Sequence, residues 1–437
     1  MSYITDMSFL REYIARRPNT IALIALFCLA GFRLSVFAAA TTLIPMDDAQ
    51  SDHLKAYGVV FKTLKQGGTV YWLLNFRGGS FAVQNVADIE LLCRMQGVKS
   101  NAVTNTEWAT ILTTIDNNNM EKVVLEKAPK IAIYTPPSKL PWDDAVTMAL
   151  TYADIPYDKI YDKDVVSGSL TKYDWLHLHH EDFTGEYSRF FASFSSAPWY
   201  VRQKMDLEQI ARGLGFSKVS DCKKAVSLSI RTFIENGGFL FAMCSAPGTL
   251  DIALSALGTD IADVPFDGDG VDPLYKQKLN FNNCMAFENF TIITDPMLPT
   301  YGNIDVNQVN TPARIPPGDI ELFDFSAKLD PVPSMLVQNH VSTLKGFYGL
   351  FTSFNRSIIK KNITILADVP GTPEVRYIHG VRGKGQFAFL GGHDPEDYSH
   401  AIGDKPTLLD LHKHSPGYRL ILNNVLFPAA RKKEKKT

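Results

Sequence analysis

A cysteine at the junction of a strand and a helix is the first residue of this sequence that could do chemistry. The segment GGFLFAMCSAPGT (237–249) is an apolar strand that breaks into a tight turn at Cys244 and then enters a helix. This pattern is typical of a nucleophile elbow, where helix amides lower a thiol pKa and can bind an oxyanion. Ala242 and Ala246 stand where such a turn usually has glycines. A small buried cysteine is the alternative interpretation.

A histidine with a nearby carboxylate could be the base for that cysteine. In GKGQFAFLGGHDPED (383–397) a hairpin leads into a strand that ends just before His393, and Glu396 follows three residues later. A cysteine nucleophile needs a general base, and a carboxylate can orient the imidazole. We therefore predict that Cys244 attacks, His393 is the base and Glu396 orients it. A histidine that caps the loop is the alternative.

A third polar cluster lies in HLHHEDFTGEY (177–187), which begins as a strand. With the two-residue period of a strand, His177 and His179 face one way and Leu178 and His180 the other. Open α/β sheets bind their ligands at the carboxyl ends of their strands. We therefore predict that four residues at this strand end bind a ligand: His179, His180, Glu181 and Asp182.

The same residues raise the question of a metal. With His393 at a neighbouring strand end, two or three imidazoles and a carboxylate could make a zinc or similar site. No ligand spacing such as HExxH supports it, and polar loop residues that line a pocket are the alternative. We therefore predict no metal and no cofactor.

Polar residues also end the strands near the start of the chain. Asp47 and Asp48 follow a buried strand, and Arg77 begins an Arg-Gly-Gly turn after the next strand. Such a turn could bind a carboxylate or a phosphate, or it could need glycine only for a positive φ. We predict that Asp47, Asp48 and Arg77 bind ligand.

The elements that position these residues alternate between strand and helix. Strands are expected at 41–46, 69–76, 130–136, 158–166 and 290–295, and helices at 52–66, 141–155, 203–213, 219–236 and 415–427. Alternation of this kind favours βαβ units and a parallel sheet. We predict a small α/β unit at 41–127, then a flavodoxin-like parallel-sheet domain at 128–430 with an insertion at 262–350.

The first forty residues have the pattern of a secretory signal. Three arginines precede an apolar run at 20–32, and three alanines follow at 38–40. Arg33 interrupts the apolar stretch, which is short for a spanning helix of about 20 residues. We predict that residues 1–40 are a signal peptide and that the protein is exported, periplasmic or extracellular. An uncleaved membrane anchor is the alternative, and no other membrane contact is expected.

The composition bounds the remaining possibilities. The 437 residues, of which 45% are hydrophobic, are enough for two or three folded domains. The 44 basic and 46 acidic residues give a net charge of −2, which does not favour nucleic acid as a partner. Five cysteines without CxxC spacing are too few for a disulfide scaffold. The basic tail at 431–437 reads as a solvated end.

Several of these segments together resemble the class I glutamine amidotransferase-like superfamily. They are KIAIYTP, GGFLFAMCSAPGT, GKGQFAFLGGHDPED and the closing PGYRLILNNVLF, within residues 128–430. The chain looks most like the ThuA-like branch, whose members show a GKGxxxxxxGHD pattern before a final helix with Asn. The resemblance implies that a Cys-His-Glu triad would fall on Cys244, His393 and Glu396. The family has one residue between His and Glu, whereas this chain has two, and ThuA-like members commonly lack the cysteine.

Exported sequences similar to the whole chain tend to carry the label asparagine synthetase B. Such a synthetase has a nucleophilic Cys after the initiator Met, whereas this chain has Ser2, and its Ser-Gly-Gly-x-Asp-Ser loop for ATP is missing. We predict instead a hydrolase of amide or carbohydrate-derived small molecules. The alternative is a non-catalytic module that uses the loops at 177–187 and 391–397 to bind a ligand or a partner.

Overall fold

The computed structural model describes residues 41–137, 144–306, 319–345, 353–397 and 405–431. The predicted signal peptide at 1–40 lies outside the described residues, as do Pro141 and most of the basic tail. Among the residues that are described, no helix is long and apolar enough to cross a membrane.

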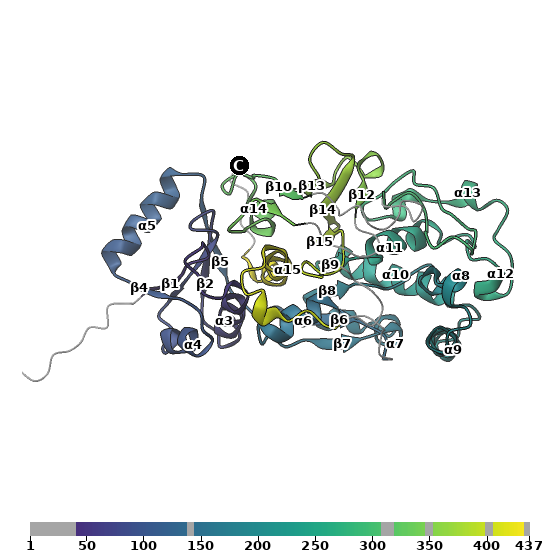
Figure 1. Ribbon diagram of the computed structural model, residues 1–437, viewed down its shortest axis with the longest axis horizontal. Coiled ribbons are helices and arrows are strands. Elements are labelled where there is room, and N and C mark those ends of the chain that lie inside the picture. The colour runs from purple at the N-terminus through teal and green to yellow at the C-terminus, as the bar shows by residue number, and fades with distance from the viewer. Residues whose placement is uncertain (1–40, 138–143, 307–318, 346–352, 398–404, 432–437) are drawn as a thin grey trace, which may run out of the picture. The chain divides into compact units, whose positions relative to one another are not determined.

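The N-terminal strands form a five-stranded antiparallel sheet in the order β4-β1-β3-β2-β5 (Figure 1). These strands are β1 (Thr41–Ile44), β2 (Val70–Leu74), β3 (Ser80–Gln84), β4 (Asn101–Val103) and β5 (Glu121–Leu125), and the helices between them are α3 (His53–Lys65), α4 (Ile89–Met95) and α5 (Asn105–Asn117). The parallel pairing predicted for this part is wrong. The reason is the short turn at 75–79, because a connection of five residues between β2 and β3 permits only antiparallel pairing.

A second sheet contains the parallel strands that position the candidate site. These strands are β6 (Ile131–Tyr134), β7 (Asp158–Ile160), β8 (Trp175–Leu178), β9 (Phe239–Met243) and β15 (Gly385–Leu390). They lie in the order β7-β6-β8-β9-β15, and each pairs in parallel with its neighbour. All five therefore end at one edge, which we call the carboxyl edge. The predicted α/β class with parallel strands is confirmed.

The sheet continues beyond β15 through antiparallel strands, so it is mixed rather than purely parallel. These strands are β14 (Glu374–Arg382), β13 (Thr364–Asp368), β10 (Ile320–Leu322) and β11 (Thr343–Leu344), and β12 (Phe354–Asn355) pairs with β14. The strand expected at 290–295 does not form. Ile292 makes only an isolated bridge to Gly302, because Pro296 and the turn after it stop the extended run.

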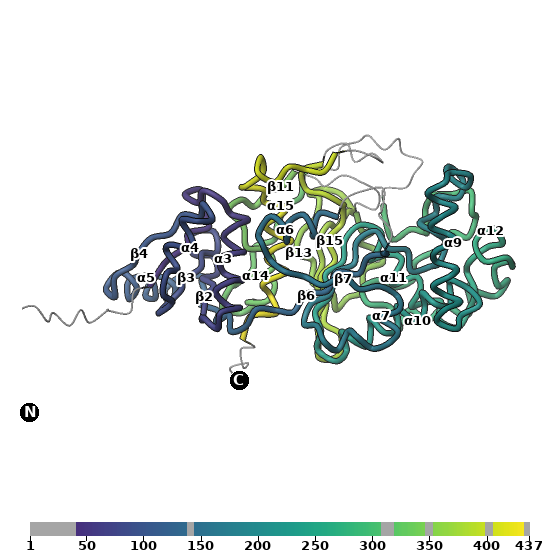
Figure 2. The backbone as a smooth tube through the Cα atoms, turned by 90° about the horizontal axis from the view of Figure 1, so that it is seen from below, coloured from purple at the N-terminus to yellow at the C-terminus, as the bar shows by residue number. Residues whose placement is uncertain are grey.

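Helices cover both faces of the parallel strands. Two of them, α6 (Ala145–Tyr152) and α15 (Pro416–Leu426), pack on one face, and α7 (Asp162–Val166), α10 (Val219–Glu235) and α11 (Ala246–Ser255) pack on the other (Figure 2). In β9, Phe239 and Phe241 belong to the first core and Leu240 and Ala242 to the second. Alternate side chains thus fill two cores, which explains why the parallel strands read as continuous apolar runs.

The remaining helices are α8 (Phe191–Phe194), α9 (Pro198–Gly213), α12 (Val264–Asp267), α13 (Tyr275–Lys278) and α14 (Pro331–Leu336). The strand predicted at 158–166 ends at Ile160, because Asp164 caps the start of α7 by accepting a hydrogen bond from the backbone N–H of Tyr161 at 3.1 Å.

Candidate active site at the carboxyl edge

Loops that follow three parallel strands meet at the carboxyl edge. His179 and His180 follow β8, Cys244 follows β9, and His393 follows β15. The backbone N–H of Cys244 donates to the carbonyl oxygen of Gly392 at 3.1 Å, which joins two of these loops. Residues predicted separately from three segments of the sequence therefore lie together.

Three imidazoles pack against one another in what we call the histidine cluster, His179, His180 and His393. The ring centroids of His180 and His393 are 4.4 Å apart, and His179 lies 4.1 Å and 4.5 Å from them. The Nε2 atom of His393 is 3.1 Å from Nδ1 and 3.3 Å from Nε2 of His180. Each of the three residues is at most 8% exposed, so the cluster is shielded from water.

Contacts behind the cluster hold the ring of His179 in place. Burial lowers the pKa of His177 to about 4, so this imidazole is neutral at pH 7. Its Nδ1 donates to the carbonyl oxygen of Phe241 at 3.0 Å, which leaves Nε2 as an acceptor 3.3 Å from Nδ1 of His179. Asp144, the cap of α6, places a carboxylate oxygen 3.5 Å from the same Nδ1. Nδ1 of His179 is thus the nitrogen that contacts His177 and Asp144, and its Nε2 lies on the other side of the ring.

That Nε2 atom is buried and has no hydrogen-bond partner among the described residues. Buried polar atoms are normally paired, so this buried nitrogen without a partner among the described residues points to a ligand. This feature separates His179 from a histidine that only packs in the core.

Cys244 occupies the predicted turn but is not an activated thiol. Its φ is 54°, a left-handed value that is uncommon outside glycine and typical of a strained elbow. The residue is only 7% exposed, and burial raises its pKa to about 12. At neutral pH it is therefore a protonated thiol.

Glu396 lies in the loop after His393 and makes a described contact with another histidine. Its carboxylate is 3.2 Å from Nδ1 of His412, and its backbone N–H donates to Asp394 at 2.9 Å. The described geometry thus gives Glu396 a role in orienting His412.

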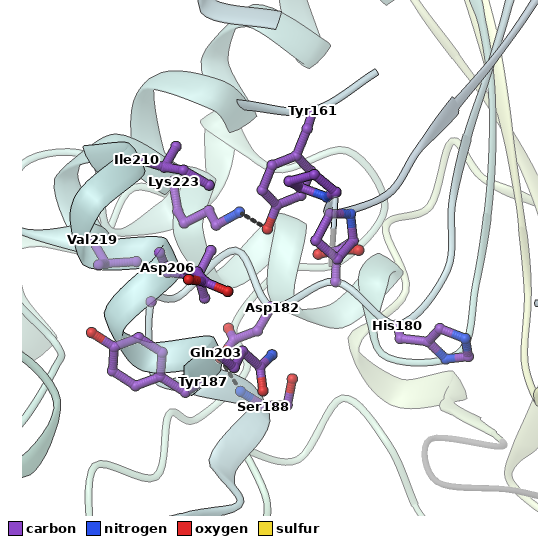
Figure 3. Close-up of a pocket in the computed structure, with 15 residues that line it drawn as sticks. Tyr161, His180, Asp182, Tyr187, Ser188, Gln203, Asp206, Ile210, Val219 and Lys223 are labelled. Carbon is purple, nitrogen blue, oxygen red and sulfur yellow. Dashed lines mark hydrogen bonds between the residues drawn. The ribbon is translucent and has the colours of Figure 1, made fainter. Parts of the chain in front are cut away.

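A pocket adjoins the histidine cluster through His180 (Figure 3). It lies between Pro136, which follows β6, and His180–Asp182, which follow β8. In the close-up, Asp182, Gln203 and Ser188 gather on one side, and the ring of His180 points away from them. The predicted ligand residues His180, Glu181 and Asp182 all line this pocket, whereas His179 lies behind it in the cluster.

Charged side chains line the pocket, and hydrogen bonds hold them in place. The Nζ atom of Lys223 is 3.0 Å from both carboxylate oxygens of Asp162 and donates to the Tyr161 hydroxyl at 3.1 Å. Asp182 accepts hydrogen bonds from the N–H groups of Thr184 at 2.7 Å and Ser188 at 2.8 Å. These bonds hold the polar lining in place before any ligand arrives.

The other predicted ligand residues belong to a different place. Arg77 makes a two-pronged ion pair with Asp47, at 2.6 Å and 3.1 Å, and Asp48 is exposed. Gly78 has a φ of 74°, so the turn needs glycine for its backbone conformation. No contact joins Asp47 or Arg77 to the histidine cluster within the described part of the chain.

Sequence reasoning missed Asp144 and did not assign a role to His177. The signal for Asp144 was present, because an acidic residue at the start of a helix that follows a parallel strand must lie at the carboxyl edge. The contacts of Lys223 with Tyr161 and Asp162 were not visible, because Lys223 lies in α10 and the other two residues lie at the start of α7.

The fold and site together define a mixed α/β protein with its polar centre at the carboxyl edge of parallel strands. No family model matches the chain, and no curated protein matches it. Two cytoplasmic proteins of Salmonella typhimurium are similar in structure, at 13% and 12% identity, with TM-scores of 0.34 and 0.32, over 69% of this chain and 100% of theirs. A putative ThuA-like protein from Bacteroides uniformis matches at 11% identity and a TM-score of 0.27, over 67% of this chain and 90% of its own. Scores this low assign neither a family nor a function.

Proposed function

We propose that this protein is a hydrolase of small polar molecules, derived from amides or carbohydrates, that bind in the pocket at the carboxyl edge. The order β7-β6-β8-β9-β15 is 2-1-3-4-5 in sequence terms, the flavodoxin-like order of the amidotransferase-like superfamily. In such sheets ligands bind where the strand order reverses, outside the first and third strands. The pocket beside Pro136 and His180 has this position, which supports the proposal.

The observation that carries the proposal is that His180 belongs to both the pocket and the histidine cluster. A substrate in the pocket lies beside imidazoles, the side chains best suited to proton transfer near neutral pH. In the proposed reaction a water molecule gives up a proton at the histidine cluster. The water oxygen then bonds to the electrophilic carbon of the substrate, and the leaving group departs with a proton.

A cysteine mechanism is the second candidate, and the strained φ of Cys244 favours it. In this mechanism Cys244 attacks the substrate, His393 takes the thiol proton and Glu396 orients His393. The raised pKa of Cys244 counts against it, because only the thiolate is a nucleophile. This mechanism therefore requires substrate binding to ionise the thiol.

The test is a panel of p-nitrophenyl glycosides, aminoacyl p-nitroanilides, glutamine and asparagine, with the purified protein and its variants. We expect turnover of at least one member and a loss of about 100-fold or more in His180→Gln. The matched control is His379→Gln, since His379 is also buried but bonds to Gln386 on the hairpin. Activity that is equal in the two variants, or a panel member that stabilises the protein without being cleaved, overturns the hydrolase proposal. The second result identifies a binding module.

A further inference from the structure

We infer that the histidine cluster is a binding site for one Zn²⁺ ion, with His179, His180 and His393 as its ligands. This inference goes beyond the proposed function and is tested without it, because metal binding is measured directly rather than through activity.

The first argument is the state of His179. His177 and Asp144 contact Nδ1 of His179, whereas its Nε2 is buried and has no hydrogen-bond partner among the described residues. His179 is 2% exposed, and one of its ring nitrogens lies within 4.8 Å of a ring nitrogen of His180 and of His393. An imidazole nitrogen is the commonest metal ligand in proteins.

The second argument is distance. Two ligands of a tetrahedral zinc ion with bonds of about 2.0–2.1 Å are about 3.3 Å apart. The nitrogens of His393 and His180 are already 3.1 Å and 3.3 Å apart. One nitrogen from each of the three histidines lies within 4.8 Å of the others, so small side-chain rotations bring all three onto one ion.

The third argument is the support behind the ligand. Metal-binding histidines usually donate their other N–H to a carboxylate or a carbonyl group, which fixes the ring and raises its basicity. Nδ1 of His179 faces both Asp144 at 3.5 Å and His177 at 3.3 Å. Asp144 also supplies negative charge near a buried cation.

The three imidazole ligands indicate which metal ion the cluster would bind. Imidazoles suit zinc and its neighbours, whereas magnesium and calcium need oxygen ligands. Three histidine ligands leave one position of a tetrahedral ion for water or substrate, an arrangement typical of catalytic rather than structural zinc.

The neighbouring set Asp144, His177 and His179 is a poorer site. Both ring nitrogens of His177 are already engaged, one with the Phe241 carbonyl group and one with His179. The set Asp260, Asp267 and Asp269 is also disfavoured, because the Lys218 amine already contacts all three carboxylates.

The first test is metal content. Full-length protein without an affinity tag is treated with a chelator, incubated with ZnCl₂, desalted and analysed by mass spectrometry for zinc. We expect one zinc per chain, a loss of at least tenfold in affinity for His179→Asn and His393→Asn, and no change for the control His379→Gln. Zinc binding that is absent, or that survives both cluster variants, overturns the inference.

The second test needs no variant and therefore does not depend on how the variants fold. X-ray absorption at the zinc edge of the loaded wild-type protein counts the imidazoles around the ion. We expect three imidazole ligands at about 2.0 Å and no sulfur. A sulfur shell, or fewer than three imidazoles, contradicts the assigned ligand set.

Discussion

At the scale of single residues, burial decides the chemistry of a side chain more than its type does. Cys244 has the turn of a nucleophile, yet its enclosure keeps the proton on sulfur. His179 shows a different outcome, because its buried Nε2 has no hydrogen-bond partner among the described residues. Burial therefore keeps Cys244 protonated, and it leaves Nε2 of His179 without a hydrogen-bond partner among the described residues.

The first prediction concerns the thiol of Cys244. A pKa near 12, against an ordinary value of about 8.5, reduces the thiolate fraction at pH 7 by roughly a thousandfold. We expect iodoacetamide to label Cys244 in the folded protein at least a hundred times more slowly than in urea, with no change in His393→Ala. Peptide mass spectrometry measures both rates. Fast labelling below pH 7 that slows in His393→Ala supports the cysteine mechanism instead.

The second prediction concerns the buried ion pair of Lys223 and Asp162. Both side chains are 2% exposed, and Lys223→Met leaves Asp162 as a buried charge without its cation. We expect this variant to lower the free energy of unfolding by about 3–5 kcal/mol, measured by urea denaturation. Lys163→Met on the exposed side of α7 is the control and changes it by less than about 1 kcal/mol. A double variant with Asp162→Asn recovers part of the loss, and a single variant as stable as the control contradicts the expectation.

At the scale of elements, the sequence was informative where a local pattern determines the structure. The helical spacing of 52–66 predicted α3, and the apolar runs ending at Met243 and Leu390 predicted β9 and β15. Because parallel strands share a carboxyl edge, the meeting of His179, Cys244 and His393 was within reach of sequence reasoning.

Other elements depend on partners that no local pattern encodes. The strands β3, β4 and β5 are short, and their antiparallel pairing with β1 and β2 depends on turns rather than on periodicity. The ring of His177, which contacts His179, is held by the carbonyl oxygen of Phe241, more than sixty residues away in sequence. Sequence reasoning therefore singled out the three histidines but not the contacts behind them.

The third prediction concerns a junction between elements that holds three imidazoles beside one guanidinium. His53 of α3 lies 3.0 Å from His414 and stacks on His340 at 4.3 Å, and Arg419 of α15 donates to His340 at 3.0 Å. Burial, with help from the charge of Arg419, lowers the pKa of His53 to about 2 and that of His340 to about 4. The exposed Asp48 and a backbone hydrogen bond to His414 both act to raise the pKa of His340.

Below the ordinary histidine pKa of about 6.5, the unfolded chain binds protons that the folded junction excludes, so stability falls as the pH falls. The free energy of unfolding is compared at pH 7.5 and pH 5. We expect its fall between these pH values to be about 2 kcal/mol smaller in His53→Gln than in the wild type. Urea denaturation at the two pH values measures this difference. An unchanged pH dependence shows that the junction does not titrate in this range.

At the scale of the whole molecule, the described fold begins with β1 at Thr41, where the predicted signal peptide ends. Thr41 is buried and pairs with Gln84 and Val103, so the first described residue is already part of a sheet. The fourth prediction is that the protein isolated from its native cell starts near Thr41 and is found outside the cytoplasm. N-terminal sequencing of each cell fraction checks this. A chain that starts at Met1 in the soluble cytoplasmic fraction contradicts export.

The central claim is that the histidine cluster at the carboxyl edge is the functional centre of this molecule. The most direct test is a crystal structure of the zinc-loaded protein with anomalous data collected at the zinc edge. The account predicts one strong peak bonded to nitrogens of His179, His180 and His393 at about 2.1 Å. A map without a peak there, or with its peak at the junction of His53, His340 and His414, would contradict it.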